Sequence, residues 1–272
     1  MNTTLFKHIA IATALATISM TANATASTPA DTAPAAIDNF HTIYGKNFVA
    51  GTSTYKTTFL GNIDATFKAK TTSNGSIVAG NFSRKDDQSK YAYDGIGVSP
   101  KTGSERTPGE IDIGEYINAK FTIAGTNTDA GIYIKGFSLG LLFDGPEYND
   151  VHESVQVTAS LFGGGSLSYT FTATGTQTGF WSGPGSFVSN LSPALDGRGG
   201  IWNVSNPFGN VRVSGLSFTA IPGVAAAGCS SCTNQSDFTL ISVSAVPEPE
   251  TYAMLLAGLG LMGFVARRKQ QK

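Results

Sequence analysis

The feature that most limits how this chain can fold is an alternation of apolar and polar residues that recurs along the sequence. A period of two places successive side chains on opposite faces of an extended strand. Each alternating stretch therefore predicts a strand with one buried face and one solvated face. The stretches with this pattern are 62–69, 116–123, 155–161 and 167–174, and further strands are expected at 132–143, 211–218 and 238–243.

Turn signals separate these stretches and complete the prediction of the fold class. Ser73-Asn74-Gly75, Gly163-Gly164-Gly165 and Asn206-Pro207 each combine residues that favour tight turns. No sustained helical periodicity follows residue 40, and charged residues make up only 14% of the chain, so long soluble helices are not expected. We expect an all-β body over 41–245, folded as an antiparallel β-sandwich or jelly roll.

The first 26 residues have the organisation of a signal peptide that signal peptidase cleaves during export. Lys7 precedes an apolar stretch, Ile9 to Ile18, and small residues follow at 22–26, where the peptidase needs them. An N-terminal anchor helix is the alternative, but this stretch is much shorter than the about 20 residues that a spanning helix requires. We expect residues 27–40 to form a flexible leader in front of the body.

The C-terminal residues 246–272 combine three features in a fixed order. Pro247 and Pro249 lack backbone donors and hold the chain extended around Glu248. Residues 251–266 carry no charge and predict a single short transmembrane helix that is apolar on every face. The basic tail 267–272 follows, and its cations are expected to stay on the cytoplasmic side of the membrane.

The order Pro247-Glu248-Pro249, apolar helix and Arg267-Arg268-Lys269 resembles the PEP-CTERM sorting signal of Gram-negative bacteria. The resemblance covers residues 246–272 and implies recognition by an exosortase in the inner membrane, where the protein is anchored transiently. It also implies cleavage near 247–249 and delivery to the cell surface, the outer membrane or the extracellular matrix, often together with exopolysaccharide. An ordinary C-terminal anchor that stays in the membrane is the alternative interpretation.

The charge of the body argues against nucleic acid as a partner. Residues 27–246 hold 13 basic and 17 acidic groups, a net charge of −4. No basic patch with interleaved aromatic residues stands out, although nucleic-acid-binding domains usually concentrate lysine and arginine in this way. We therefore expect no nucleic-acid partner.

Cys229 and Cys232 are the only cysteines, and two serines separate them. Two close thiols in an exported protein normally pair, so we expect a small disulfide. A redox motif and half of a zinc site are the alternatives. The histidines His8, His41 and His152 are distant in sequence, and there is no second cysteine pair to complete a zinc site.

Two acidic stretches, 103–117 and 141–153, hold eight of the 17 acidic residues of the body. The strands expected between them, 116–123 and 132–143, could pair as a hairpin and bring both stretches to one end of a sheet. Calcium takes about six to eight oxygen ligands, which such a cluster offers, so Ca²⁺ is the one cofactor considered. The candidate ligands are Glu110, Asp112, Glu115, Asp144, Glu147 and Asp150. Solvated surface charge is the alternative.

These observations favour a structural protein of the cell surface or of an exopolysaccharide-rich biofilm matrix, and not an enzyme. The chain has no Gly-x-Ser-x-Gly motif, and only His41 and His152 remain after removal of the signal peptide. A carbohydrate-binding or calcium-dependent adhesion module is one alternative, with Trp181 and Trp202 as candidates for stacking on sugar rings unless they fill the core. A glycoside hydrolase that uses two of the acidic residues is a second alternative.

Overall fold

A computed structural model describes most of the body and a few residues of the C-terminal segment. The described residues are 41–84, 95–104, 106–143, 151–175, 178–184, 187–191, 200–224, 235–246, 257–260 and 262. The expected signal peptide, 1–26, and the leader, 27–40, lie outside them, as do the two cysteines.

One of the two large sheets has six strands, and its ladders are antiparallel. Its order is β13 (Phe187–Asn190), β14 (Trp202–Ser205), β9 (Tyr133–Gly140), β16 (Asp237–Val246) and β1 (Thr42–Tyr44), and β7 (Ile111–Asp112) pairs with the start of β16. The short 3-10 helix η1 (Gly45–Asn47) follows β1.

The other large sheet has eight strands, again paired antiparallel. Its order is β12 (Thr178–Trp181), β11 (Ser166–Gly175), β10 (His152–Leu161), β15 (Val213–Val224), β8 (Glu115–Ile123), β3 (Ile63–Ser73) and β2 (Thr54–Phe59), and β4 (Ser76–Ala79) pairs with β3. A small additional sheet consists of β5 (Asn81–Ser83) and β6 (Gly97–Ser99).

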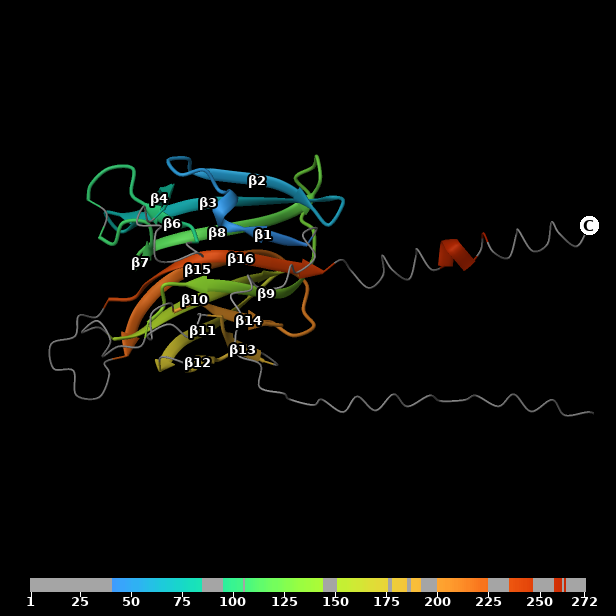
Figure 1. Cartoon of the computed structure of the whole chain (residues 1–272). Coiled ribbons are helices and arrows are strands. Elements are labelled where there is room, and N and C mark those ends of the chain that lie inside the picture. Colours follow the sequence, from blue (N-terminus) through green and yellow to red (C-terminus); the bar gives the residue numbers. More distant parts are fainter. Residues whose placement is uncertain are drawn as a thin grey trace, which may run out of the picture. The chain divides into compact units, whose positions relative to one another are not determined.

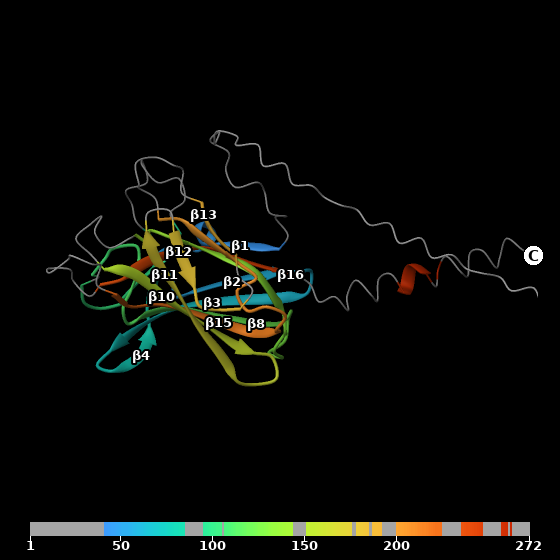
Figure 2. The same cartoon turned by 90° about the horizontal axis from the view of Figure 1, so that it is seen from below.

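The two large sheets pack face to face, and the core lies between them (Figures 1 and 2). Aromatic contacts cross this interface, because the ring of Phe137 in β9 lies 5.5 Å from Phe218 in β15 and 5.3 Å from Trp181 in β12. Phe171 in β11 and Trp202 in β14 make a similar contact at 5.4 Å. The prediction of an all-β, antiparallel sandwich is therefore confirmed.

The alternating stretches behave as the sequence predicted. In β3 the side chains of Ala65, Phe67 and Ala69 are buried in the core, whereas Lys68 between them is exposed. Each of the seven expected stretches contains a strand, although the bounds differ by a few residues. The alternation of apolar and polar residues was sufficient to predict these strands, because one face of each strand is covered by the opposite sheet.

The expected hairpin between 116–123 and 132–143 is wrong. β8 lies between β3 and β15 in the eight-stranded sheet, whereas β9 lies between β16 and β14 in the six-stranded sheet. The chain thus crosses from one layer to the other between these two strands. Alternation specifies which face of a strand is buried and leaves its hydrogen-bonding neighbour open, so adjacency in sequence was a poor guide to pairing.

The C-terminal segment is described only at 257–260 and 262, where the backbone is helical. Within the part of the chain that the structure describes, no helix has the length and apolar character needed to cross a membrane. Most of the predicted span 251–266 lies outside the described residues.

Candidate functional site

The two ends of the body meet at one end of the six-stranded sheet. β1 and β16 run antiparallel and lie side by side (Figure 1). The amide of Ala245 donates to the carbonyl oxygen of His41 at 3.0 Å. β16 ends at Val246, so no residue separates the last strand from Pro247. The chain enters and leaves the sandwich at the same end of this sheet.

The strand that leads into the C-terminal segment is a central one. β16 pairs with β9 on one edge and with β1 on the other. The side chains of Leu240, Val243 and Ala245 are buried in the core. Strands that are hydrogen-bonded on both edges and buried open least readily. The C-terminal segment is therefore attached directly to a firmly held part of the fold.

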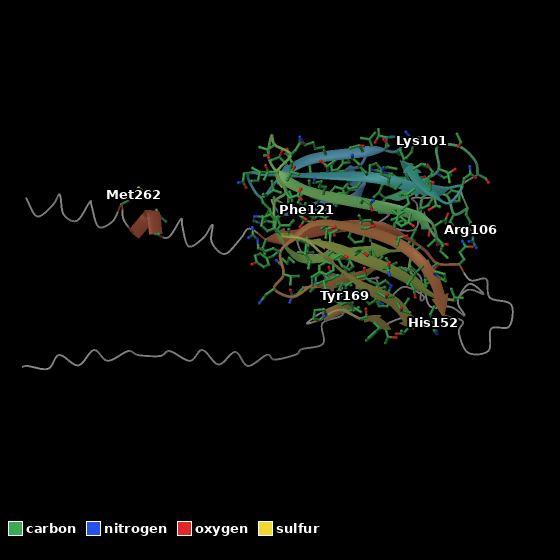
Figure 3. The ribbon with its side chains drawn as sticks, turned by 180° about the vertical axis from the view of Figure 1, so that it is seen from behind. Lys101, Arg106, Phe121, His152, Tyr169 and Met262 are labelled. Atoms are coloured by element: carbon green, nitrogen blue, oxygen red, sulfur yellow. The ribbon has the colours of Figure 1, made fainter. Side chains whose placement is uncertain are left out.

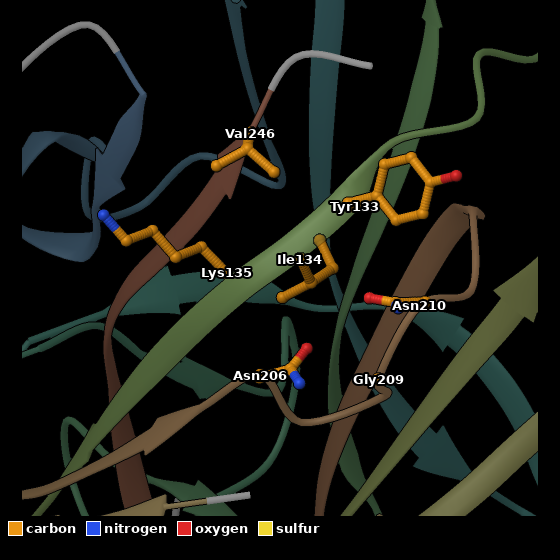
Figure 4. Close-up of a pocket in the computed structure, with 7 residues that line it drawn as sticks. All are labelled: Tyr133, Ile134, Lys135, Asn206, Gly209, Asn210 and Val246. Carbon is orange, nitrogen blue, oxygen red and sulfur yellow. The ribbon is translucent and has the colours of Figure 1, made fainter. Parts of the chain in front are cut away.

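A pocket of about 470 Å³ lies next to this exit (Figure 4). It is within the size range of small-ligand sites. β9 and the connection between β14 and β15 provide most of its lining, and the end of β16 completes it. The lining residues are Tyr133, Ile134, Lys135, Asn206, Gly209, Asn210 and Val246. In Figure 4 the Lys135 ammonium group and the Tyr133 hydroxyl point away from the amides of Asn206 and Asn210, so these groups line the pocket without converging on one point.

The loop on one side of this pocket is anchored to the core. Phe208 is buried, and the indole N–H of Trp181 donates to the carbonyl oxygen of Pro207 at 3.0 Å. Asn206 has φ of 49°, a left-handed conformation that asparagine tolerates better than most residues. The Asn206-Pro207-Phe208-Gly209 turn is therefore held in place by packing and hydrogen bonding.

Trp181 and Trp202 do not form an exposed platform for sugar rings. Their exposed fractions are 4% and 1%. The indole N–H of Trp202 donates to the carbonyl oxygen of Leu142 at 2.9 Å, as that of Trp181 does to Pro207. Gly179 lies against Trp202, and a Cβ at this glycine would come within 2.6 Å of Phe171. Both rings fill the core, which contradicts the stacking hypothesis for these two residues.

The structure describes three of the candidate calcium ligands, which lie directly before β7, at the end of β7 and at the start of β8. Glu110, Asp112 and Glu115 are all buried, and Asp237 is the β-ladder neighbour of Asp112. The amide of Asp112 donates to Oε2 of Glu115 at 3.0 Å. The pairing of β7 with β16 places Asp237 beside Asp112, and Glu115 follows Asp112 by three residues, so the expected hairpin has no part in this cluster.

Hydrogen bonds from neutral groups satisfy part of the cluster. The amide of Thr107 donates to Oδ2 of Asp112 at 2.9 Å, and its hydroxyl donates to Oδ2 of Asp237 at 3.2 Å. Gln235 donates to the same Asp237 oxygen at 2.8 Å. Burial raises the pKa of Asp112 above its ordinary value, and the nearby charge of Asp237 adds to this effect. Oδ1 of Asp112 has no hydrogen-bond partner among the described residues.

The calcium hypothesis itself stays a prediction. Across the described ranges, no three His, Cys, Asp or Glu side chains lie close enough together to hold a metal ion. Asp144, Glu147 and Asp150 lie outside those ranges, and so do Cys229 and Cys232 with their expected disulfide.

The geometry defines the chain as an antiparallel β-sandwich whose central strand β16 ends directly before Pro247. Residues 245–269 match the family model of the PEP-CTERM protein-sorting motif. The chain therefore carries a PEP-CTERM sorting motif, which indicates an exported protein that is sorted at the membrane as an exosortase target. Searches of curated proteins and of solved structures gave no match.

The predicted sorting residues all fall within the matched range, and they are Pro247, Glu248, Pro249, Arg267, Arg268 and Lys269. Sequence reasoning did not find the pocket, because its lining comes from three separate segments. In the sequence, Tyr133 and Lys135 are ordinary alternating strand residues, and only the turn signal at Asn206-Pro207 pointed to this region.

Proposed function

We propose that the mature protein is a structural, non-enzymatic component of the cell surface or of the exopolysaccharide-rich extracellular matrix of a Gram-negative bacterium. Signal peptidase removes the N-terminal segment, and the inner membrane holds the C-terminal segment until an exosortase processes it. The protein then reaches the surface or the biofilm matrix as a folded sandwich.

One observation carries this proposal: the match to the sorting motif begins at Ala245, within the last two residues of the central strand β16. Cleavage after Val246 would leave every described strand of the body in the product. The prolines that follow lack backbone donors and favour an extended backbone, the form in which peptidases bind their substrates. Processing therefore separates the folded domain from its C-terminal sorting segment.

The proposal is tested by following both chain ends in the native host. In wild-type cells we expect intact mass spectrometry of the surface and matrix fractions to find a protein without its first residues and without its C-terminal helix. In cells that lack the exosortase, the C-terminal segment should persist and the protein should fractionate with the membrane.

A pair of variants makes the test specific to the motif. The double variant Pro247→Ala, Pro249→Ala should accumulate in the membrane with its C-terminal segment uncut. Pro222→Ala, an exposed proline in β15, changes the same residue type outside the motif and should be processed normally. Recovery of matrix protein that still carries its C-terminal helix would contradict the proposed route, and turnover of a polysaccharide by the purified protein would contradict the non-enzymatic role.

A further inference from the structure

Acidic and basic side chains of this body differ in their burial. The described residues include seven carboxylates, and all of them except Asp129 are buried. In contrast, seven of the ten described lysines and arginines are exposed: Lys46, Lys56, Lys68, Lys101, Arg106, Lys120 and Lys135. Figure 3 shows two of them, Lys101 and Arg106, projecting from one end of the body. The described surface is thus cationic, although the body as a whole has a net negative charge.

Four lysines gather on the outer face of the eight-stranded sheet. Because Ala65, Phe67 and Ala69 point into the core, Lys68 and Lys70 of β3 point outward. Lys56 of β2 and Lys120 of β8 flank the same strand, since both are ladder neighbours of Thr66. We call Lys56, Lys68, Lys70 and Lys120 the lysine face.

Carboxylates compensate only half of this charge. Lys56 Nζ lies 2.9 Å from Oδ2 of Asp64, and Lys120 Nζ lies 2.9 Å from Oδ1 of Asp129. The two lysine side chains nevertheless remain 58% and 61% exposed. Lys68 and Lys70 have no ion pair with any residue that the structure describes. The lysine face therefore has positive charge available for a partner.

Asp64 keeps its negative charge on mild acidification, so its ion pair with Lys56 persists. The hydroxyl of Thr58 donates to Oδ1 at 2.7 Å, and the amide of Gly125 donates to Oδ2 at 3.1 Å. These hydrogen bonds, together with Lys56, lower the pKa of Asp64 to about 2. The compensation of Lys56 by Asp64 is therefore the same across the neutral and mildly acidic range.

A row of hydroxyl and amide side chains continues from the lysine face across the same sheet. It crosses β3, β8, β15, β10 and β11 and consists of the successive ladder neighbours Lys68, Asn118, Ser217, Thr158 and Ser168. The hydroxyl of Ser217 donates to Oδ1 of Asn118 at 2.7 Å, and the Thr158 and Ser168 hydroxyls lie 2.7 Å apart. With neighbouring strands about 4.8 Å apart, the row is about 19 Å long.

We propose that the lysine face and this polar row bind a carboxylated polysaccharide of the matrix, a polymer of the uronic acid type. The lysines pair with its carboxylates, and the hydroxyl and amide groups donate to and accept from its hydroxyls. This inference rests on the proposed matrix function and names the partner for it.

The composition of the face favours a sugar polymer over other polyanions. Single-stranded nucleic acid is normally held by a series of aromatic side chains on which successive bases stack, whereas the row contains none and β8 places a single one, Tyr116, beside Lys70. Anionic lipid headgroups need cations but make little use of a long row of neutral donors and acceptors. A polysaccharide carries repeated carboxylates and hydroxyls together, which matches both parts of the surface.

Binding of this kind depends on several weak contacts acting together. An exposed ion pair contributes little by itself, and linked contacts on one polymer add to a useful affinity. Salt screens such contacts, because the Debye length falls from about 30 Å at 0.01 M to about 3 Å at 1 M. We therefore expect tight binding at low ionic strength and its loss at high ionic strength.

The test uses the full chain in mild detergent with sodium alginate as the carboxylated probe and dextran as the neutral one, both with a chelator present. We expect alginate and not dextran to bind at low salt. The double variant Lys68→Gln, Lys70→Gln should weaken alginate binding about tenfold, from the loss of two exposed charge contacts. Lys68→Arg, Lys70→Arg should retain it.

The matched control is Lys46→Gln, Lys101→Gln, which removes the same charge from exposed positions outside the lysine face. It should change alginate binding less than twofold, and all variants should keep the wild-type melting temperature. Equal weakening by both pairs, equal binding of dextran, or tighter binding of DNA or of anionic vesicles would overturn the proposal. Export and processing of Lys68→Gln, Lys70→Gln are expected to be normal, so a failure of polysaccharide binding is distinguishable from a failure of the sorting function.

Discussion

Replacement of Trp202 by alanine should destabilise the sandwich severely, because the ring lies in the core and not on the surface. Trp202 of β14 packs on Phe171 of the opposite sheet and is 1% exposed. Removal of a buried tryptophan side chain typically costs about 3–5 kcal/mol through lost burial and the cavity left behind. A single change of this size consumes a large part of the about 5–15 kcal/mol that stabilises a typical domain.

The hydrogen bond of the indole adds to this loss. Its N–H donates to the carbonyl oxygen of Leu142, a residue that is itself fully buried. A buried acceptor without a donor costs about 1–3 kcal/mol. The variant Trp202→Phe keeps a ring against Phe171 but removes this donor, so it should be destabilised by about 1–3 kcal/mol, clearly less than Trp202→Ala.

The assay is chemical unfolding in guanidinium chloride followed by far-ultraviolet circular dichroism, which does not depend on the indole that is removed. Phe180→Ala provides the matched control, since Phe180 is an aromatic residue of β12 with a 59% exposed side chain. Its free energy of unfolding should change by no more than about 0.5 kcal/mol. If Trp202→Ala costs no more than Phe180→Ala, the core position of Trp202 and the argument against sugar stacking are both refuted.

Four further predictions concern acid (two of them), chain length and redox state. As the pH falls from 3.8 to about 2, the melting temperature of the wild-type protein should decrease more steeply than that of Asp64→Asn. The reason is that the pKa of Asp64 is lowered to about 2, so its stabilising negative charge is lost within this pH range. Asp112→Asn should show the opposite sign: the raised pKa of Asp112 makes wild type lose stability as the pH rises above 3.8, and the variant should lack this loss in the same melting series. A chain that ends at Val246 should fold cooperatively by circular dichroism, whereas one that ends at Ser236 and lacks β16 should not. The two cysteines should react with an alkylating agent only after reduction, and alkylation of the untreated protein would exclude the disulfide.

Much of the fold could be predicted from local patterns. Alternation in 62–69 and 155–161 identified both the strands and their buried faces, because the pleat of a strand is a property of neighbouring residues. The pairing of strands could not be predicted in this way. β8 and β9 are consecutive in the sequence, yet they belong to different sheets. Pairing depends on packing among residues that are distant in the sequence.

For the candidate site, too, the linear motif could be predicted from the sequence and the surface formed by strand pairing could not. The sorting segment is readable from the sequence because its motif is a linear order of prolines, apolar residues and cations, which does not depend on the fold. The lysine face is not readable, since Lys56, Lys68 and Lys120 become neighbours only when β2, β3 and β8 pair in one register.

By itself, the sequence determined the sorting motif of the protein and the strand character of its body, because both follow from residues next to one another in the chain. Only the tertiary structure decided that the acidic residues Glu110, Asp112 and Glu115 and the tryptophans are buried while the lysines stay outside. The physical reason is that burial is shared among many residues: a side chain leaves water only when strands from distant parts of the chain cover it, and that choice is made by the packing of both sheets together.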